Sequence, residues 1–186
     1  CRPSSWRIAQ ELGLQLVVDL PFKGDISDAQ IGEWVQRIGA SKADMFLNHG
    51  SASLYQRLVA QAKGAGLKTT FMAVNSGSSQ IAAGLGPLAK GMVFAQVVPN
   101  PWARKLAIAR EYQDAARKAD PKADFSYGAL EGYLTAKALG MSLQATGRDL
   151  NRANWLRTMS NARFDLGGLV IQYKPGQHDG CLLYTS

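Results

Sequence analysis

Polar side chains that could bind a small ligand follow two of the predicted strands. Residues 43–48 and 68–74 are apolar runs, and each leads into a short polar segment. In an open parallel sheet, the carboxyl ends of the strands lie at one edge, where loops converge and helix N-termini offer free N–H groups. We therefore expect ligand contacts at this edge. The candidate ligand-binding residues here are His49, Ser51, Asn75 and Ser76.

Helix capping is the alternative role for the serines in these segments. A serine just before a helix often accepts a hydrogen bond from a backbone N–H of the first turn. The serines concerned are Ser51, Ser53, Ser78 and Ser79, each near the start of a predicted helix. The sequence leaves both roles open for each of them.

Catalytic chemistry has less support than binding. His49 and Ser51 could suggest a nucleophile and its base, but no G-x-S-x-G motif and no acidic partner accompany them. The segment 84–91, GLGPLAKG, has the glycines of a phosphate loop, but it lacks the G-K-[ST] ending and precedes a strand. Two histidines and two cysteines, Cys1 and Cys181, offer no zinc spacing. We therefore predict no enzymatic activity, no metal site and no cofactor.

The composition is that of a protein with a folded core. The chain has 186 residues, of which 46% are hydrophobic and 19% charged, which fits one or two domains. The net charge is +7, but lysines and arginines are dispersed, which indicates solvated helix faces and no nucleic-acid partner. No run approaches the roughly 20 apolar residues of a membrane-spanning helix, and no signal peptide opens the sequence. Cys1 could mark a lipid-anchored N-terminus, although helical apolar spacing begins so soon that we interpret it as a fragment end.

The first half of the chain alternates strands with helices. Apolar runs predict strands at residues 14–20, 43–48, 68–74 and 91–98. Helical spacing predicts helices at residues 27–39, 52–65 and 79–85. Ser27 and Gln30 form the capping box of the first of these helices. This alternation predicts one parallel four-stranded sheet over residues 14–98 with right-handed crossovers.

A helical period dominates after two prolines at 99 and 101. The predicted elements are helices at residues 102–119, 126–146 and 152–161, followed by a strand at 166–173. We expect the third helix, capped by Asn151, to bury Trp155, Leu156 and Met159. Glycines in the middle helix, at 128, 132 and 140, are predicted to permit close backbone packing.

Several segments occur in an order that is typical of one protein family. They are ISDAQIGEWVQRIGASKADMFLNHG, LVAQAKGAGLKTTFMAV, GMVFAQVVPNPW, SYGALEGYLTAKAL and FDLGGLVIQYKPGQHDG. Over roughly residues 6–180 the chain resembles substrate-binding proteins of ABC transporters, the leucine/isoleucine/valine-binding type of periplasmic binding protein. The resemblance implies a type I periplasmic-binding-protein fold, which is α/β with a parallel Rossmann-like sheet and flanking helices. In that family two lobes, joined by three crossing segments, close on a ligand.

The resemblance also implies a domain organisation. The implied parts are the second lobe at residues 6–98, a hinge with first-lobe helices at 99–163, a returning strand at 164–180, and a tail at 181–186 with no family counterpart. Val98, Pro99 and Pro101 would form the hinge, which the two prolines would stiffen. The chain would then be a fragment that lacks the N-terminal part of the family.

The family's ligand contacts match this sequence only in part. Ser51 occupies a position that contacts ligand in the family, whereas Asn75 stands where amino-acid-binding members have a glutamate that pairs with the ligand's ammonium. An amide carries no charge, and burying an ammonium without a carboxylate is costly. The resemblance therefore favours a ligand without an α-ammonium, such as a small carboxylate or an aromatic acid. Tyr127, at the start of a first-lobe helix, is a further candidate, with core packing as its alternative role.

The function implied by the resemblance is solute binding for an ABC importer of branched-chain amino acids or related small carboxylates. Its partners would be the small-molecule ligand and the ABC permease in the membrane, and the full-length protein would be a periplasmic monomer. Two different functions remain open. One is a ligand-sensing domain of a receptor or transcriptional regulator with the same fold, and the other is an α/β hydrolase.

Overall fold

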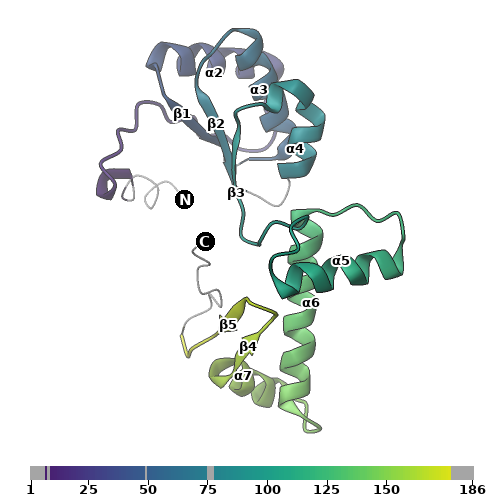
Figure 1. Ribbon diagram of the computed structural model, residues 1–186. Coiled ribbons are helices and arrows are strands. Elements are labelled where there is room, and N and C mark those ends of the chain that lie inside the picture. The colour runs from purple at the N-terminus through teal and green to yellow at the C-terminus, as the bar shows by residue number, and fades with distance from the viewer. Residues whose placement is uncertain (1–6, 8, 49, 75–77, 177–186) are drawn as a thin grey trace. The chain divides into compact units, whose positions relative to one another are not determined.

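The computed structural model describes residues 7, 9–48, 50–74 and 78–176. The chain divides into two compact units, Cys1–Ala95 and Gln96–Ser186, and each is described by itself. Figure 1 shows their helices and strands. In the described part of the chain, no helix is long and apolar enough to cross a membrane.

The first unit contains a parallel sheet. Its strands are β1 (Met45–Asn48), β2 (Thr70–Val74) and β3 (Val93–Ala95), and β2 lies in the middle. The helical elements that follow residue 27 in this unit are α2 (Asp28–Ser41), α3 (Ala52–Gly64), α4 (Ser78–Leu85) and the short 3-10 helix η1 (Gly86–Ala89). Both strand pairs are parallel, so the predicted α/β class with a parallel sheet and flanking helices is confirmed.

Helix α2 begins at the predicted capping box. Ser27 Oγ accepts a hydrogen bond from the Gln30 backbone N–H at 3.3 Å, and the Gln30 side chain accepts one from the Ser27 N–H at 3.0 Å. These two bonds satisfy backbone donors that the first helical turn leaves unpaired. Lys42 ends the helix in the left-handed region, with φ of 52°. The sequence therefore determines both ends of α2 locally.

The two faces of the sheet differ in burial. Phe71 and Ala73 of β2 lie in the core with apolar residues of α2, α3 and α4. The residues paired with Phe71 and Ala73, such as Phe46 and Phe94, pack against this core from the same face. Leu47 belongs to the other row of the pleat and is largely exposed. The helices therefore bury one face of the sheet.

The prediction of a strand at residues 14–20 is wrong, and so is the four-stranded sheet over 14–98. Among the described residues, the parallel sheet has three strands, and 14–20 has no regular secondary structure. Leu14, Leu16 and Val17 are exposed. An apolar run supplies strand propensity, but a strand also requires a neighbour with which to pair its backbone, and this segment pairs with none of the described strands. The strand predicted at 91–98 is also shorter, since β3 ends at Ala95.

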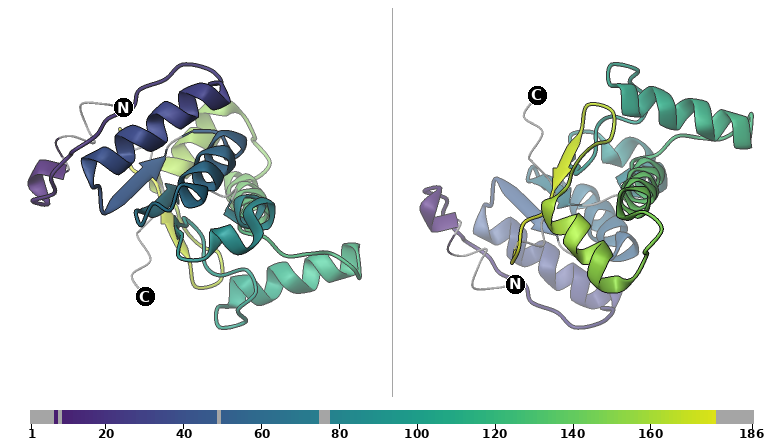
Figure 2. Two further views of the ribbon diagram at one scale, coloured as in Figure 1. Left: turned by 90° about the horizontal axis from the view of Figure 1, so that it is seen from above. Right: turned by 90° about the horizontal axis from the view of Figure 1, so that it is seen from below.

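The second unit combines three helices with a two-stranded hairpin. The helices are α5 (Ala107–Ala119), α6 (Tyr127–Thr146) and α7 (Arg152–Asn161), and the antiparallel strands are β4 (Arg163–Asp165) and β5 (Val170–Gln172). Figure 1 shows both α5 and α6 lengthwise, whereas Figure 2 shows α6 end-on and α5 still lengthwise. The two helices therefore cross steeply. Ile108, Leu130 and Phe164 bring α5, α6 and β4 into one core.

Two predicted helices of this unit begin where expected and one does not. Ser126 caps α6 by accepting from the Ala129 N–H at 3.1 Å, and Asn151 caps α7 by accepting from the Asn154 N–H at 3.0 Å. Helix α5, predicted from residue 102, begins only at Ala107. The residues before it form a turn instead, because the Asn100 side chain accepts a hydrogen bond from the backbone there.

Two further predictions for this unit are wrong. Helix α7 buries none of its residues fully: Leu156 is exposed, and Trp155 is only half-buried. The indole N–H of Trp155 donates to Ser142 Oγ of α6 at 2.9 Å, so a polar contact replaces the expected apolar one. A Cβ added at Gly132 or Gly140 would meet nothing within 4 Å, so these glycines do not mark close packing in the described structure.

The hairpin departs from the single strand predicted at 166–173. Strand β4 was not predicted, and the turn that joins it to β5 contains Gly167 and Gly168, with φ of 108° and 94°. Asp165 accepts hydrogen bonds from both glycine N–H groups at 2.8 Å. These bonds hold the pKa of the Asp165 carboxyl below its ordinary value. A three-residue strand before this turn is too short to show a period in the sequence.

Candidate ligand-binding site

The carboxyl edge of the sheet in the first unit is the candidate site. Strands β1 and β2 are parallel and neighbouring, with Asn48 paired in register with Ala73. Both strands therefore end at the same edge, and α3 starts there. The loop after β2, which carries Asn75 and Ser76, lies outside the described residues, as does His49 after β1.

Ser51 caps helix α3, which is the second of the two roles that the sequence left open for it. Its Oγ accepts a hydrogen bond from the Leu54 N–H at 3.2 Å, and its backbone is extended, as an N-cap requires. Ser51 is also exposed. A hydroxyl that accepts through oxygen still has a hydrogen to donate, so the cap leaves Ser51 able to donate to a ligand oxygen.

Asn48 is a polar residue of this edge that was not among the predicted ligand-binding residues. It is only 7% exposed, and its carboxamide forms no hydrogen bond with any residue that the structure describes. It lies on the same face of the pleat as Phe46, next to the start of α3. Buried amides normally find a partner, so Asn48 offers both a donor and an acceptor at this edge. The sequence contains a sign of this role, because the polar residue Asn48 ends an apolar run that predicts a strand.

The close packing of Phe22 and Asn48 around residue 50 requires a glycine at this position. A Cβ at this position would lie 2.8 Å from Cζ of Phe22 and 3.1 Å from Oδ1 of Asn48. Phe22 in turn contacts Trp34 of α2 edge-to-face, with ring centroids 5.5 Å apart. The backbone at Gly50 can therefore approach Phe22 this closely only because residue 50 has no side chain.

Tyr55 of α3 contacts both strands that end at this edge, β1 and β2. Its hydroxyl donates to the Met72 carbonyl of β2 at 2.7 Å and lies 3.4 Å from the Phe46 carbonyl of β1. Burial raises the pKa of the Tyr55 hydroxyl well above its ordinary value, so the proton stays in place. The two strands that lead to the candidate site are thus tied together by one buried side chain of α3.

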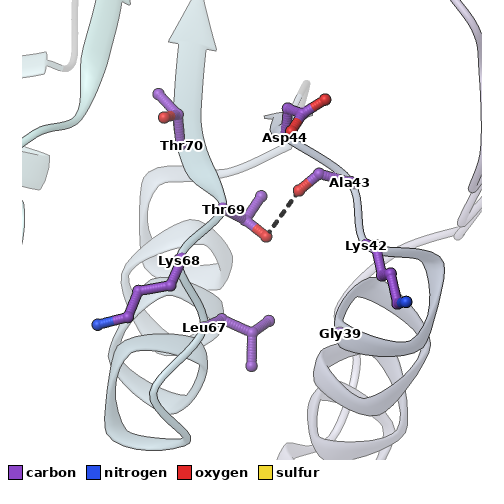
Figure 3. A pocket seen from close by; sticks show the side chains of 8 residues that line it. All are labelled: Gly39, Lys42, Ala43, Asp44, Leu67, Lys68, Thr69 and Thr70. Atoms are coloured by element: carbon purple, nitrogen blue, oxygen red, sulfur yellow. Dashed lines mark hydrogen bonds between the residues drawn. The ribbon is translucent and has the colours of Figure 1, made fainter.

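A surface hollow lies at the opposite edge of the sheet. It has a volume of about 620 Å³ and is lined by residues at the amino ends of β1 and β2 and at the end of α2, including Lys42, Asp44 and Lys68. Figure 3 shows the Thr69 hydroxyl directed to the Ala43 carbonyl, a hydrogen bond of 3.0 Å. None of the predicted ligand-binding residues lines it. In parallel α/β sheets ligands bind at the carboxyl edge, so we do not assign this hollow as the site.

The second unit contains the remaining predicted residues. Tyr127 is the first residue of α6 and is half-buried against Trp102, with ring centroids 5.4 Å apart. Val98 packs against the core of this unit, and Pro101 is fully buried. Sequence reasoning missed Trp102, although an isolated tryptophan after two prolines was visible in the sequence.

Metal coordination has no support within the described residues. No group of three or more His, Cys, Asp and Glu side chains there could hold a metal ion. The polar groups that the described residues place at the carboxyl edge include an amide, a hydroxyl and the backbone N–H groups at the start of α3, and none of these three is charged. Such groups can hydrogen-bond a small polar solute.

The fold corresponds to a known class of ligand-binding proteins. A family model for periplasmic binding proteins matches residues 4–180. The chain therefore belongs to the periplasmic binding protein family. This family binds small-molecule ligands and works with ABC permeases. Among curated proteins, no match was found.

Solved structures agree with this assignment. A possible leucine/isoleucine/valine-binding protein from Rhodopirellula baltica SH 1 is 28% identical with a TM-score of 0.67, over 73% of this chain and 37% of that one. An extracellular ligand-binding receptor from Verminephrobacter eiseniae ef01-2 is 25% identical with a TM-score of 0.71, over 91% of this chain and 50% of that one. A branched chain amino acid ABC transporter protein from Thermus thermophilus with bound valine shares the fold, with 18% identity, a TM-score of 0.72, and coverage of 95% and 50%. The chain thus spans half or less of the length of these structures.

Proposed function

We propose that this protein is the solute-binding component of an ABC importer and that it binds a small organic acid or a branched-chain amino acid without transforming it. The match of the family model over residues 4–180 is the observation that carries this proposal. The carboxyl edge of the sheet supports it, because β1 ends there in Asn48 and α3 begins there at the Ser51 cap. The protein works in the periplasm in this proposal, and an ABC permease in the membrane receives its ligand.

The proposed ligand contacts come from the loops that follow β1 and β2. Ser51 donates its hydroxyl hydrogen to the ligand while its oxygen caps α3. His49 and Ser76 are proposed contacts because they follow the ends of β1 and β2 along the chain, and Asn75 is proposed from the resemblance to the family as well. Tyr127 of the second unit is proposed as a further contact, and residues 98–101 are proposed as part of a hinge.

The class of ligand follows from the residue at position 75. Family members that bind amino acids have a glutamate at this position, whereas this chain has an asparagine. The cost of an unpaired buried ammonium is several kcal/mol, and about 1.4 kcal/mol corresponds to a tenfold change in affinity. We therefore infer that acids without an α-ammonium bind better than leucine or valine.

Calorimetric titration tests this inference with two ligands of the same carbon skeleton. Leucine and 4-methylpentanoate differ only in the ammonium group. The parent chain should bind 4-methylpentanoate at least about tenfold more tightly, and Asn75→Glu should reverse the order. Asn75→Gln is the matched control, because it changes length without adding charge, and it should keep the parent's order.

Tight binding of leucine by the parent chain would contradict the inference about the ligand. A preference for leucine that Asn75→Glu leaves unchanged would have the same meaning. Solute binding itself would still stand in either case. Failure of the parent chain to bind any acid or amino acid would instead contradict the proposed function.

A ligand-sensing domain of a receptor is the second candidate. The similarity to an extracellular ligand-binding receptor, at 25% identity over 91% of this chain, favours it over a transcriptional regulator or a hydrolase. Importer component and receptor would both bind a small ligand at the same edge of the sheet, so the same titration applies to both. Transfer of the ligand to a permease in reconstituted vesicles would distinguish the importer from the receptor.

A further inference from the structure

The hollow at the amino edge of the parallel sheet lies at the other end of the strands from the candidate ligand-binding site. Its volume is about 620 Å³, within the range of roughly 300–1,000 Å³ that small-molecule sites have. Figure 3 shows that its lining comes from the end of α2 and from the segments that lead into β1 and β2. All of these residues belong to the first unit, so the hollow needs no contribution from the second.

Two lysines line this hollow without an ion pair. Lys42 and Lys68 are exposed, and neither side chain forms a hydrogen bond or an ion pair with any residue that the structure describes. Asp44 is the one acidic residue of the lining, so two cations stand beside a single carboxylate. Lys90, also exposed, lies shortly before β3 and adds a third cation to the residues that precede the strands. This excess of positive charge favours an anion as the occupant.

Hydrogen bonds join the two segments that carry these lysines. Thr69 Oγ1 donates to the Ala43 carbonyl at 3.0 Å, and both residues are buried. The Thr70 N–H donates to the Asp44 carbonyl at 2.8 Å. Ala43 and Thr69 directly follow the two lysines in the sequence, so these bonds limit how far the lysine backbones can separate. The hollow is therefore formed before a ligand binds, which lowers the entropic cost of binding.

Helix capping is the alternative role of the two lysines, because lysine side chains often bind the last carbonyls of a helix. At the end of α3, the Ala62 carbonyl accepts a hydrogen bond from the Leu67 N–H at 3.0 Å. At the end of α2, the Ile38 carbonyl accepts one from the Ser41 hydroxyl at 2.8 Å. Lys42 contributes only its backbone N–H to the end of α2. Neither ammonium group takes part in these caps.

Lys42 has a backbone conformation that favours glycine. Its φ is 52°, and it is the one non-glycine residue with a positive φ among those that the structure describes. Gly66, just beyond the end of α3, has a φ of 76°. A side chain with a Cβ is disfavoured in this region, so glycine would suit the backbone better than lysine at position 42. A lysine in this conformation indicates a use for its side chain.

We propose that this hollow binds a phosphate group between the side chains of Lys42 and Lys68. A phosphate monoester carries about 1.5 to 2 negative charges near neutral pH and has three acceptor oxygens, so it can bind both ammonium groups at once. A carboxylate has one charge and two oxygens and matches the pair less well. The phosphate group can be free in solution or belong to a lipid such as phosphatidate. This site is separate from the carboxyl edge, and the proposal does not depend on solute binding there.

NMR titration of the parent chain with inorganic phosphate at constant ionic strength tests the proposal. The amide signals of residues 42–44 and 68–70 should shift and then saturate as phosphate is added. Titration with acetate should show binding at least about tenfold weaker, because acetate has a single charge.

Three variants separate phosphate binding from stability, and each removes one positive charge. Lys68→Gln should weaken phosphate binding at least about tenfold. Lys42→Gly should weaken it as much while the melting temperature stays the same or rises, because glycine suits a φ of 52°. Lys23→Gln is the matched control, because this exposed lysine of the same unit precedes the start of α2, whereas the hollow lies at its end. It should bind phosphate as the parent does.

Vesicles distinguish the two sources of the phosphate group. Sedimentation compares vesicles of phosphatidylcholine alone with vesicles that also contain phosphatidate. Binding to phosphatidate vesicles that Lys42→Gly abolishes would identify a lipid as the source. Saturable binding of inorganic phosphate without binding to vesicles would identify a free phosphate. Either result supports the site.

Four results would overturn the proposal. The first is that the parent binds neither inorganic phosphate nor phosphatidate vesicles. The second is that acetate binds as tightly as phosphate. The third is equal weakening in Lys23→Gln and Lys68→Gln, which would mean that net charge alone attracts the anion. The fourth is a lower melting temperature in Lys42→Gly with unchanged phosphate binding, which would assign Lys42 to structure. All four leave solute binding at the carboxyl edge untouched.

Discussion

Different kinds of contact stabilise each of the two units internally. In the first unit, one core of thirteen buried residues joins the sheet to α2, α3 and α4 among the described residues. In the second, the described core has seven buried residues, and single polar side chains fasten its segments to one another. Gln113 holds the turn at Pro101, and Lys137 of α6 donates to the Leu166 carbonyl of the hairpin at 3.0 Å. Apolar patterning therefore explains the first unit better than the second.

This difference predicts where substitutions are most costly. A residue in the shared apolar core of the first unit contacts several elements, so its loss leaves a cavity. A polar side chain such as Gln113 in the second unit holds one segment by hydrogen bonds. Its replacement by alanine removes these hydrogen bonds and leaves a buried polar group without a partner. A partly exposed ion pair contributes least, because water screens it.

The largest effect is expected for the core of the first unit. Phe71→Ala removes a fully buried ring from β2 and should lower the free energy of unfolding by about 3–5 kcal/mol. Leu47→Ala is the control, because Leu47 belongs to the neighbouring strand but is exposed, and it should cost less than about 1 kcal/mol. Urea denaturation measures both. Equal losses would mean that the buried face of the sheet is assigned wrongly.

A smaller effect on the free energy of unfolding is expected for Gln113 of the second unit. Gln113→Ala leaves the carbonyl of buried Pro101 without its donor and should cost about 1–3 kcal/mol. Asp114→Ala is the matched control, because it removes only the exposed 3.1 Å ion pair to Arg104 and should cost at most about 1 kcal/mol. Chemical denaturation compares the two variants. If Asp114→Ala were the more costly, the turn would depend on its surface charges and not on the buried amide.

The smallest effect is expected for the ion pair between α5 and α6, and it depends on pH. A hydrogen bond from Lys137 holds the pKa of Glu111 below its ordinary value of 4.5, and a hydrogen bond from Tyr133 contributes as well. Because the folded-state pKa is depressed, the pair stabilises the chain fully above the ordinary value. This contribution is lost as the pH falls through the folded-state pKa. Burial, together with the hydrogen bond to Glu111, raises the pKa of Tyr133 to about 12, so its hydroxyl stays protonated throughout.

Glu111→Gln should therefore flatten part of the acid dependence of stability. The expected loss at neutral pH is less than about 1 kcal/mol, because the pair is partly exposed. Glu33→Gln in α2 makes the same chemical change at an exposed position and serves as the control for the substitution itself. Unfolding measured from neutral to acid pH gives both values. A Glu111→Gln variant with the parent's full acid dependence would show that other carboxyls account for it.

Local sequence signals predicted many of the elements. The capping box of Ser27 and Gln30, the Asn151 cap and the bounds of α6 could be predicted because caps and apolar periods are properties of neighbouring residues. The strand at 14–20 could not be excluded in this way, because pairing depends on a distant partner. The start of α5 was predicted too early for a similar reason. Its preceding turn is held by Gln113, which lies nine residues beyond Arg104.

The candidate site was predictable only as a location. The order of strands and polar loops indicated the carboxyl edge of the sheet, and Ser51 lies there. The sequence did not reveal that Asn48 is buried without a partner among the described residues, or that Gly50 fits against Phe22. Both facts depend on contacts between segments that are distant along the chain. The same holds for the pairing of Trp102 with Tyr127.

Native mass spectrometry of the parent chain with a panel of small acids and amino acids tests the central claim, solute binding without turnover, most directly. We expect that one molecule of an organic acid is retained per chain and that the molecule recovered after release has its original mass. Retention of no member of the panel would contradict solute binding. Recovery of a product with a different mass would show that the chain is an enzyme.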